Sequence, residues 1–279
     1  MADELERARK ALRDLGKTLK NLPTDLPPKE VHKLRTATRR VEAIAALAPG
    51  DQKKSRRLLK SIEPVRKAAG GVRDMDVLLA NARRLARYSA GDSATRLGDS
   101  LTRLLEQLEI ARQRNAAELR RALHRRRDAA RQNLKQYSKL VQSALTAAGP
   151  TASVNGQEHE EIHAAAMNVV RELGEWPPLS AENIHAFRLK VKELRYILQL
   201  SADADTGLAG ALGQVQRRIG DWHDWQHLDE IAREILNPER DGLLLTRIGH
   251  TTKRKFDQAL AAANALRGKY LAMPFATGI

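Results

Sequence analysis

Prolines and glycines cut this chain into segments of helix-forming residues, and this punctuation limits the fold to packed helices. Ala, Leu, Arg, Lys, Glu and Gln recur throughout, and all have high helix propensities. No stretch shows the apolar–polar alternation and β-branched enrichment that are typical of strands. Because proline cannot continue a helix, Pro23, Pro27 and Pro28 must separate the first two helices. The sequence therefore predicts an all-α fold.

Breakers and capping residues set the bounds of each predicted helix. Gly70 and Gly220 are the expected C-terminal ends of two helices, because glycine favours the position just after a helix. Asp74 and Asp224 are the expected N-caps of the helices that follow. We predict helices over residues 3–20, 29–48, 51–69, 74–88, 93–147, 158–174, 180–200, 207–219, 223–237 and 240–271.

A small, uncharged stretch near the middle of the chain predicts a linker. Residues 148–157 are rich in Ala, Gly and polar residues, and they follow the longest helical segment. We therefore expect one helical repeat over residues 1–147 and a second over residues 158–279. The length of 279 residues has room for one large domain or two small ones.

Two short motifs recur in the two halves in the same order. The segment VHKLR at residues 31–35 is similar to IHAFR at residues 184–188, an offset of 153 residues. The segment GGVRD at residues 70–74 is similar to GDWHD at residues 220–224, an offset of 150 residues. Two matches in register indicate a duplicated bundle of about four or five helices in each half.

Basic residues follow one face of the second predicted helix in each half. At 100° per residue, His32, Arg35 and Arg39 fall within about 60° of one another. The corresponding face in the second half holds His185, Arg188, Lys192, Arg195 and, on the histidine side, Tyr196. Like charges at this spacing destabilise a bare helix, whereas a phosphate that accepts from Arg and Lys bridges them. A solvated helix face is the alternative explanation.

The overall charge also points to a polyanionic partner. The formal net charge is +15, which favours nucleic acid, an acidic membrane surface or a phosphate polymer. Aromatic residues make up only 4% of the chain, which argues against aromatic platforms for base stacking. The densest basic run, residues 111–139, is expected to be a solvated helix face, although it also offers nucleic acid a place to bind. Further candidates for the anion-binding surface are Lys54, Arg57, Lys60, Arg217 and Lys253.

Several classes of protein and site are excluded or disfavoured. The absence of cysteine excludes disulfides, thiol catalysis and cysteine-based metal sites. No stretch approaches the roughly 20 apolar residues of a membrane span, and the first ten residues lack an apolar signal core. A cytoplasmic protein is therefore expected. Residues 159–163 read HEEIH, a formal zinc-protease match, but the glycine and third histidine that extend the motif are absent. We predict no metal and no cofactor.

The motifs together resemble the CHAD domain family, whose name stands for conserved histidine α-helical domain. The resemblance rests on the segments VHKLRTATRRVEA, GGVRDMDVLL, IHAFRLKVKELRYIL and IGDWHDWQHL. It implies two tandem, pseudo-symmetric four-helix bundles around a basic cavity that binds inorganic polyphosphate, and an association with polyphosphate or storage granules. By position, it implies polyphosphate-binding roles for His32, Arg35, Arg39, Arg40, His185, Arg188, Lys192 and Arg195.

We therefore expect a non-enzymatic polyphosphate-binding protein, because the basic faces carry neither a carboxylate metal clamp nor a nucleophile with a base beside it. A general polyanion or nucleic-acid binder is one alternative. A metal-dependent polyphosphate hydrolase is another, and it requires Asp74, Asp76, Asp221 or Asp224 to gather around Mg²⁺. A granule-surface adaptor is a third.

Overall fold

The computed structural model describes residues 2–47, 52–86, 93–148, 156–200 and 206–271, so most of the predicted linker lies outside the described residues. Within these ranges the chain forms α-helices and one short π-helix, without a β-strand. The predicted all-α class is confirmed. None of the helices in these ranges is long and apolar enough to cross a lipid bilayer.

The chain divides into two compact units. Unit 1 comprises residues 1–88 and 102–153, and unit 2 comprises residues 89–101 and 154–279. The duplication that the repeated motifs indicate, and its boundaries, stay a prediction.

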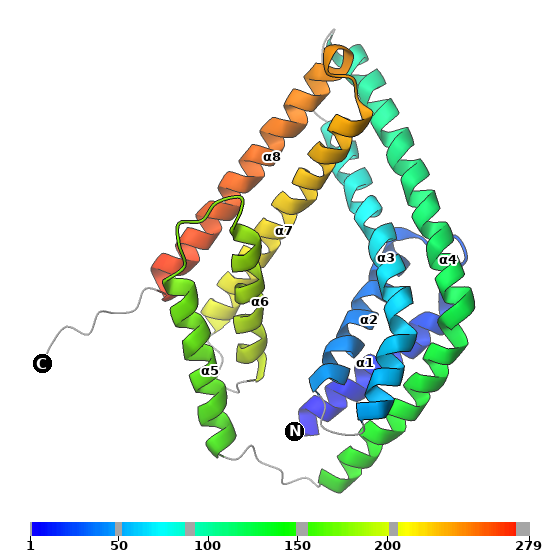
Figure 1. Ribbon diagram of the computed structural model, residues 1–279, viewed down its shortest axis with the longest axis vertical. Helices are drawn as coiled ribbons and strands as arrows, with labels where there is room; N and C mark the ends of the chain where they lie inside the picture. Colours follow the sequence, from blue (N-terminus) through cyan, green and yellow to red (C-terminus); the bar gives the residue numbers. More distant parts are fainter. Residues whose placement is uncertain (1, 48–51, 87–92, 149–155, 201–205, 272–279) are drawn as a thin grey trace, which may run out of the picture. The chain divides into compact units, whose positions relative to one another are not determined.

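Unit 1 contains helices α1 (Ala2–Asn21), α2 (Pro28–Leu47), α3 (Gln52–Ala86) and most of α4 (Ser93–Ala148). Helix α1 packs against α2, and α2 packs against α3 (Figure 1). Apolar side chains at helical spacing on all four helices form one core. Its fully buried members include Leu15, Leu34, Leu58 and Leu119.

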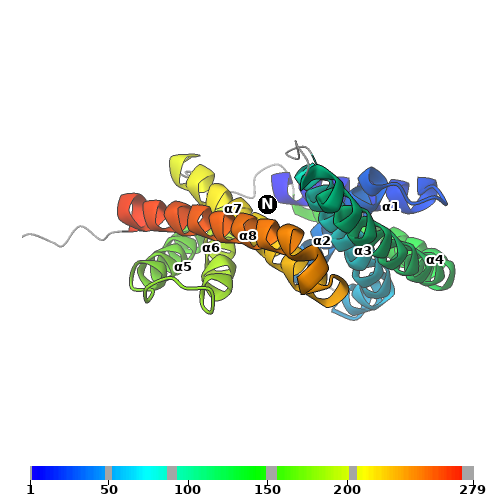
Figure 2. The same cartoon turned by 90° about the horizontal axis from the view of Figure 1, so that it is seen from above.

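Unit 2 contains α5 (Gly156–Gly174), α6 (Ile184–Leu200), α7 (Thr206–Ile235), α8 (Pro238–Leu266) and the π-helix η1 (Arg267–Leu271). Helices α7 and α8 lie side by side along most of their length (Figures 1 and 2). Helix α6 packs against both α5 and α7. The core between them is apolar and includes Leu173, Phe187, Val191, Ile219 and Trp222.

Helix α4 contributes to both units. Its first turns, up to Leu101, belong to unit 2, and the rest of the helix belongs to unit 1. In unit 2 the Ser100 hydroxyl donates a hydrogen bond of 2.7 Å to the buried carboxylate of Asp241. The same carboxylate accepts the Asn237 backbone N–H at 3.0 Å, at the start of α8. The beginning of α4 is thereby fixed to the beginning of α8.

Two predicted helix ends are wrong. Helix α3 continues through Pro64 and Gly70, and α7 continues through Gly220. Asp74 and Asp224, predicted as N-caps, therefore lie inside helices.

Core packing explains why these helices do not end at the glycines. The apolar face of α3 stays buried on both sides of its glycines, at Ala69 and Val72. The apolar face of α7 does the same at Ile219 and Trp222. Because a glycine inside a helix costs only about 1 kcal/mol relative to alanine, burial of several apolar side chains outweighs it.

Three arginines of α4 hold the proline-rich connection between α1 and α2. They come from the basic run that the sequence predicted to be a solvated face, and each donates to a backbone carbonyl. Arg112 Nη2 donates to Leu26 O at 2.9 Å, Arg120 Nε to Thr24 O at 3.1 Å and Arg127 Nη2 to Lys20 O at 2.9 Å. These bonds satisfy carbonyls that the end of α1 and the connection leave without helical partners.

Arg112 also forms a buried ion pair with Asp76 of α3. Arg112 Nε lies 2.6 Å from Asp76 Oδ1, and the two side chains are only 14% and 2% exposed. The same guanidinium holds Leu26, whose φ of 52° is in the left-handed region that non-glycine residues rarely adopt. One side chain therefore fixes both the α3–α4 contact and the connection before α2.

Replacing Asp76 with Asn is expected to lower the free energy of unfolding by about 3 kcal/mol, because it leaves the buried Arg112 charge without its carboxylate. Urea denaturation followed by circular dichroism measures this loss. The matched control is Asp74→Asn, the same change at an exposed position of α3, which should cost less than about 0.5 kcal/mol. Equal losses in the two variants would contradict this account of the pair.

Candidate functional site

The antiparallel α2–α3 hairpin of unit 1 brings the two sequence motifs of the first half together. Near one end of the hairpin, Ser55 on α3 donates a hydrogen bond to the Ala45 carbonyl on α2. Toward the other end, His32 on α2 lies close enough to Arg73 on α3 to interact with its charge. The histidine motif and the GGVRD motif therefore share one seam between α2 and α3.

In each unit the guanidinium group of an arginine lies beside a glycine of the neighbouring helix. A Cβ atom at Gly70 would lie 4.0 Å from Arg35 Nε, and one at Gly220 would lie 3.6 Å from Arg188 Nη2. A side chain longer than alanine at either position would take the space of the guanidinium group. Arg188 Nε also donates to the Gln216 carbonyl at 3.4 Å. An alanine at either position would make ordinary contact with the guanidinium, and each glycine marks where a half-buried arginine lies against the neighbouring helix.

His32 lies in a positively charged environment on this seam. Partial burial is the main cause that lowers the pKa of His32 below its usual value of 6.5. The charges of Arg73 and Arg35 lower this pKa further. A negatively charged ligand at the seam would counteract the two arginines and raise the pKa again.

One acid lies at the end of the basic face on α2. Glu42 Oε2 is 3.2 Å from Arg66 Nε on α3, so this carboxylate is paired within the hairpin. Arg39 is exposed on the same helix, one turn before Glu42. We define the unit 1 cluster as His32, Arg35, Arg39, Arg66 and Arg73.

The α6–α7 pair of unit 2 carries a similar set of side chains. The ring centroids of His185 and His223 are 6.0 Å apart. Arg195 Nη1 donates to Gln216 Oε1 at 2.9 Å, which holds the guanidinium against α7. We define the unit 2 cluster as His185, Arg188, Lys192, Arg195 and His223.

Arg73 and His223 were missed as binding candidates, although the sequence contained the signal. They occupy the same position of the repeated GGVRD and GDWHD motifs, just before the aspartate that was interpreted as an N-cap. Once each helix continues through its glycine, this position faces the histidine of the preceding helix. Arg66 has no counterpart in a motif and becomes visible only through its ion pair with Glu42.

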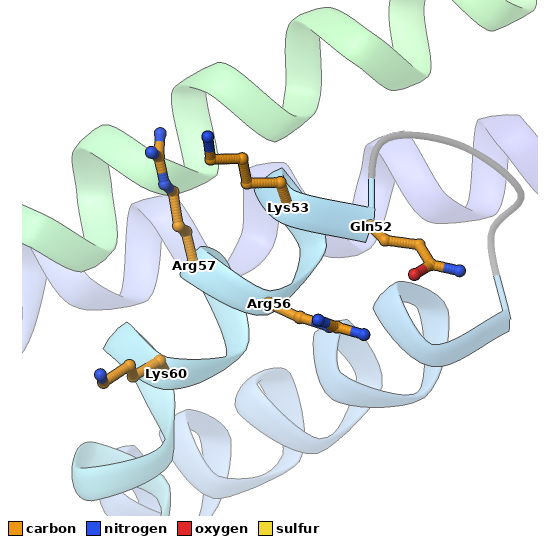
Figure 3. A pocket seen from close by; sticks show the side chains of 5 residues that line it. All are labelled: Gln52, Lys53, Arg56, Arg57 and Lys60. Carbon is orange, nitrogen blue, oxygen red and sulfur yellow. The ribbon is translucent and has the colours of Figure 1, made fainter.

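Two predicted residues, Arg57 and Lys60, lie outside the clusters, on the first turns of α3. Together with neighbouring side chains they line an open hollow of about 490 Å³ near the end of the hairpin opposite His32. Figure 3 shows Lys53 and Arg57 pointing to one side of α3, and Gln52 and Arg56 pointing to the other.

Four further predicted residues are scattered. Arg40 is exposed on α2, and Lys54 is half-buried on α3. The guanidinium of Arg217 lies beside Gly213 of its own helix, 3.4 Å from the position of a Cβ there. Lys253 pairs with Asp257 one turn later on α8, at 3.1 Å. None of these contacts joins the residue to a cluster.

The acids and histidines considered for a metal are dispersed. His163, the last residue of the HEEIH segment, is exposed on α5, and the side chains of residues 159–162 lie outside the described part. Asp221 Oδ2 accepts a hydrogen bond of 2.6 Å from Lys255 Nζ of α8. Among the residues that the structure describes, no group of three or more His, Cys, Asp or Glu side chains is placed to hold a metal ion.

A family model for the CHAD domain matches residues 6–233 of the 279-residue chain, a span that includes both clusters. The chain belongs to the CHAD domain family. This confirms the resemblance carried by the four quoted segments. CHAD domains are known in polyphosphate-associated proteins. No curated protein and no solved structure matches the chain.

Replacing Arg73 with Gln is expected to raise the pKa of His32, because it removes one of the two positive charges that disfavour the imidazolium form. The pKa should remain below 6.5, since burial is the larger cause of the shift. An NMR titration of the imidazole C–H resonances measures it. The control Arg83→Gln removes an exposed charge farther along α3 and should leave the titration of His32 unchanged. An unchanged pKa in Arg73→Gln would contradict the proximity of the two groups.

Proposed function

We propose that this CHAD-domain protein binds inorganic polyphosphate through its two clusters, without hydrolysing it. One observation carries the proposal. In both units a half-buried arginine lies against a glycine of the neighbouring helix, with a histidine beside it and further cations on the same helix pair. The membership of a family known in polyphosphate-associated proteins supports the same ligand. The basic cavity expected between the repeats stays a prediction.

Fixed, half-buried cations suit a linear phosphate polymer. Arg188, Lys192 and Arg195 follow one another at helical spacing on α6, so they present charges about one turn, or ~5 Å, apart. Arginine donates in a planar fork that matches phosphate oxygens, and its partial burial weakens screening by salt. Each bound phosphate also releases counterions from the polymer, which favours association.

The side chains of the clusters favour binding over catalysis. Phosphoryl transfer usually needs metal ions held by carboxylates, or a nucleophile with a base beside it. Two acids next to the clusters are paired with bases, Glu42 with Arg66 and Asp221 with Lys255. Binding of this kind would also bring the protein to cytoplasmic polyphosphate or storage granules, as an adaptor on their surface.

A competition titration at about 150 mM salt tests the proposal, because long-range effects of exposed charges are then screened beyond ~8 Å. Long-chain polyphosphate, orthophosphate and double-stranded DNA compete for the wild type and for a variant with Arg35, Arg39, Arg188 and Lys192 changed to Ala. The wild type should prefer polyphosphate. The variant should lose at least about tenfold in polyphosphate affinity, because it lacks four charge-assisted contacts.

A matched control removes the same charge from the exposed part of α4. It changes four residues that the structure places outside both clusters, Arg114, Arg121, Arg125 and Lys135, to Ala. This control should keep the preference for polyphosphate, and circular dichroism should show both variants to be helical. Equal competition by DNA, with greater loss in the α4 variant, would instead support a general polyanion or nucleic-acid surface. Mg²⁺-dependent release of orthophosphate would support the hydrolase alternative.

The affinity for long-chain polyphosphate is expected to rise as the pH falls from about 8 to about 6. The pKa of His32 is lowered in the free protein, and a bound polyanion raises it, so binding takes up protons. The rise should level off once the pH is below the pKa of the free protein. Calorimetric titrations in buffers of different ionisation enthalpy measure the uptake. His32→Gln should flatten the profile, and an unchanged slope in that variant would contradict the role of His32.

A further inference from the structure

The two clusters differ in a way that adds an apolar surface to unit 2. At the offset of 153 residues that relates the histidine motifs, unit 1 has Thr36 and Ala43 where unit 2 has Leu189 and Tyr196. Leu189 is 50% exposed and Tyr196 is 52% exposed, although both are large apolar side chains. Leu189, Lys192 and Tyr196 are three and four residues apart, so they share one face of α6. The unit 2 cluster therefore combines cations with exposed apolar groups.

Core packing does not account for Tyr196. Its ring is absent from the buried core of unit 2 and from the partly buried side chains that pack on this core. The Lys192 ammonium lies 5.3 Å from the ring centroid, which places a phosphate-binding cation beside the aromatic ring. Tyr270 of η1 has a similar lysine, Lys269, at 5.0 Å, but its ring packs against the core. The ring of Tyr196 therefore lies at a cationic site, and part of its surface is exposed to solvent.

The charge near this ring also differs from that in unit 1. Arg195 stands where unit 1 has the acid Glu42, and Gln216 holds its guanidinium at 2.9 Å. A ligand with an aromatic ring attached to a few phosphates matches this set, because the ring stacks on Tyr196 while Lys192 and Arg195 bind the phosphates.

We propose that the unit 2 cluster binds nucleoside oligophosphates, with the base stacked on Tyr196. The proposal rests on the proposed function, because the same cations bind the phosphates. Arg188 is eight residues before Tyr196, about 12 Å along the helix, which leaves room for a nucleoside and several phosphates. Among the Phe, Tyr and Trp side chains in the described part of the chain, Tyr196 is the one that is largely exposed. One ring accommodates one base, whereas single-stranded nucleic acid is bound by a series of stacking side chains.

The test compares ATP with inorganic tripolyphosphate, which has the same number of phosphates and no base. Isothermal titration calorimetry at about 150 mM salt, without divalent cations, measures both ligands. Tyr196→Leu keeps an apolar side chain but removes the ring, and should weaken ATP binding about tenfold while changing tripolyphosphate binding less than about twofold. The matched variant Tyr196→Phe keeps the ring and should bind both ligands like the wild type. Saturation transfer from protein to the adenine protons should be seen in the wild type and lost in Tyr196→Leu.

The outcomes separate this inference from the function on which it rests. If the wild type binds tripolyphosphate but Tyr196→Leu binds ATP like the wild type, the nucleoside site is overturned and the polyphosphate site stands. If Tyr196→Leu weakens both ligands equally, Tyr196 only positions Lys192, and the inference is also overturned. If a short single-stranded DNA binds more tightly than ATP through Tyr196, the ligand is a strand instead of a nucleotide. If the wild type binds neither phosphate ligand nor long-chain polyphosphate, the proposed function itself fails.

Discussion

The approach of an arginine to a glycine backbone determines how the candidate site of each unit is built. A glycine inside a helix costs about 1 kcal/mol relative to alanine, and α3 and α7 each accept this cost next to a buried apolar face. Beside these glycines, Arg35 and Arg188 lie half-buried against the neighbouring helix, in space that a side chain longer than alanine would fill. A guanidinium held in this way has lost much of its freedom before a ligand arrives, so binding orders fewer rotatable bonds. The seam therefore offers a preformed cation rather than a mobile one.

Holding several cations on one seam has an electrostatic cost. In unit 1 the positive charges of Arg35 and Arg73 already disfavour protonation of His32, and one carboxylate, Glu42, offsets part of the repulsion. In unit 2 Arg195 stands at the position of Glu42, and its guanidinium donates to a neutral amide, Gln216. A bound polyanion would relieve this repulsion, and its binding free energy would add to the stability of the folded protein.

The sequence predicted the helical class, and it predicted which helices carry the basic faces and on which face their histidines lie. Each of these predictions depends on local periodicity. Val31 and Leu34 are buried while His32 is exposed, as the spacing on the predicted helix required. It did not predict that α3 and α7 continue through their glycines, since glycine is a helix-ending signal that only core packing overrides. For the same reason it interpreted the ends of GGVRD and GDWHD as caps and missed Arg73 and His223. The backbone carbonyls that Arg112, Arg120 and Arg127 hold are more than eighty residues away, and no local pattern reveals such partners.

The division of α4 between the units has a consequence for how the chain is made. Unit 2 draws its opening turns from a helix that precedes the linker, and Ser100 meets Asp241 across 141 residues of sequence. A fragment that starts after the linker would leave the buried Asp241 carboxylate without this hydroxyl donor. During synthesis, the apolar side chains of Leu97 and Leu101 at the start of α4 stay exposed until the rest of unit 2 has been made. Completion of the second unit is therefore a late, long-range event, and the two halves of the sequence are not independent folding units.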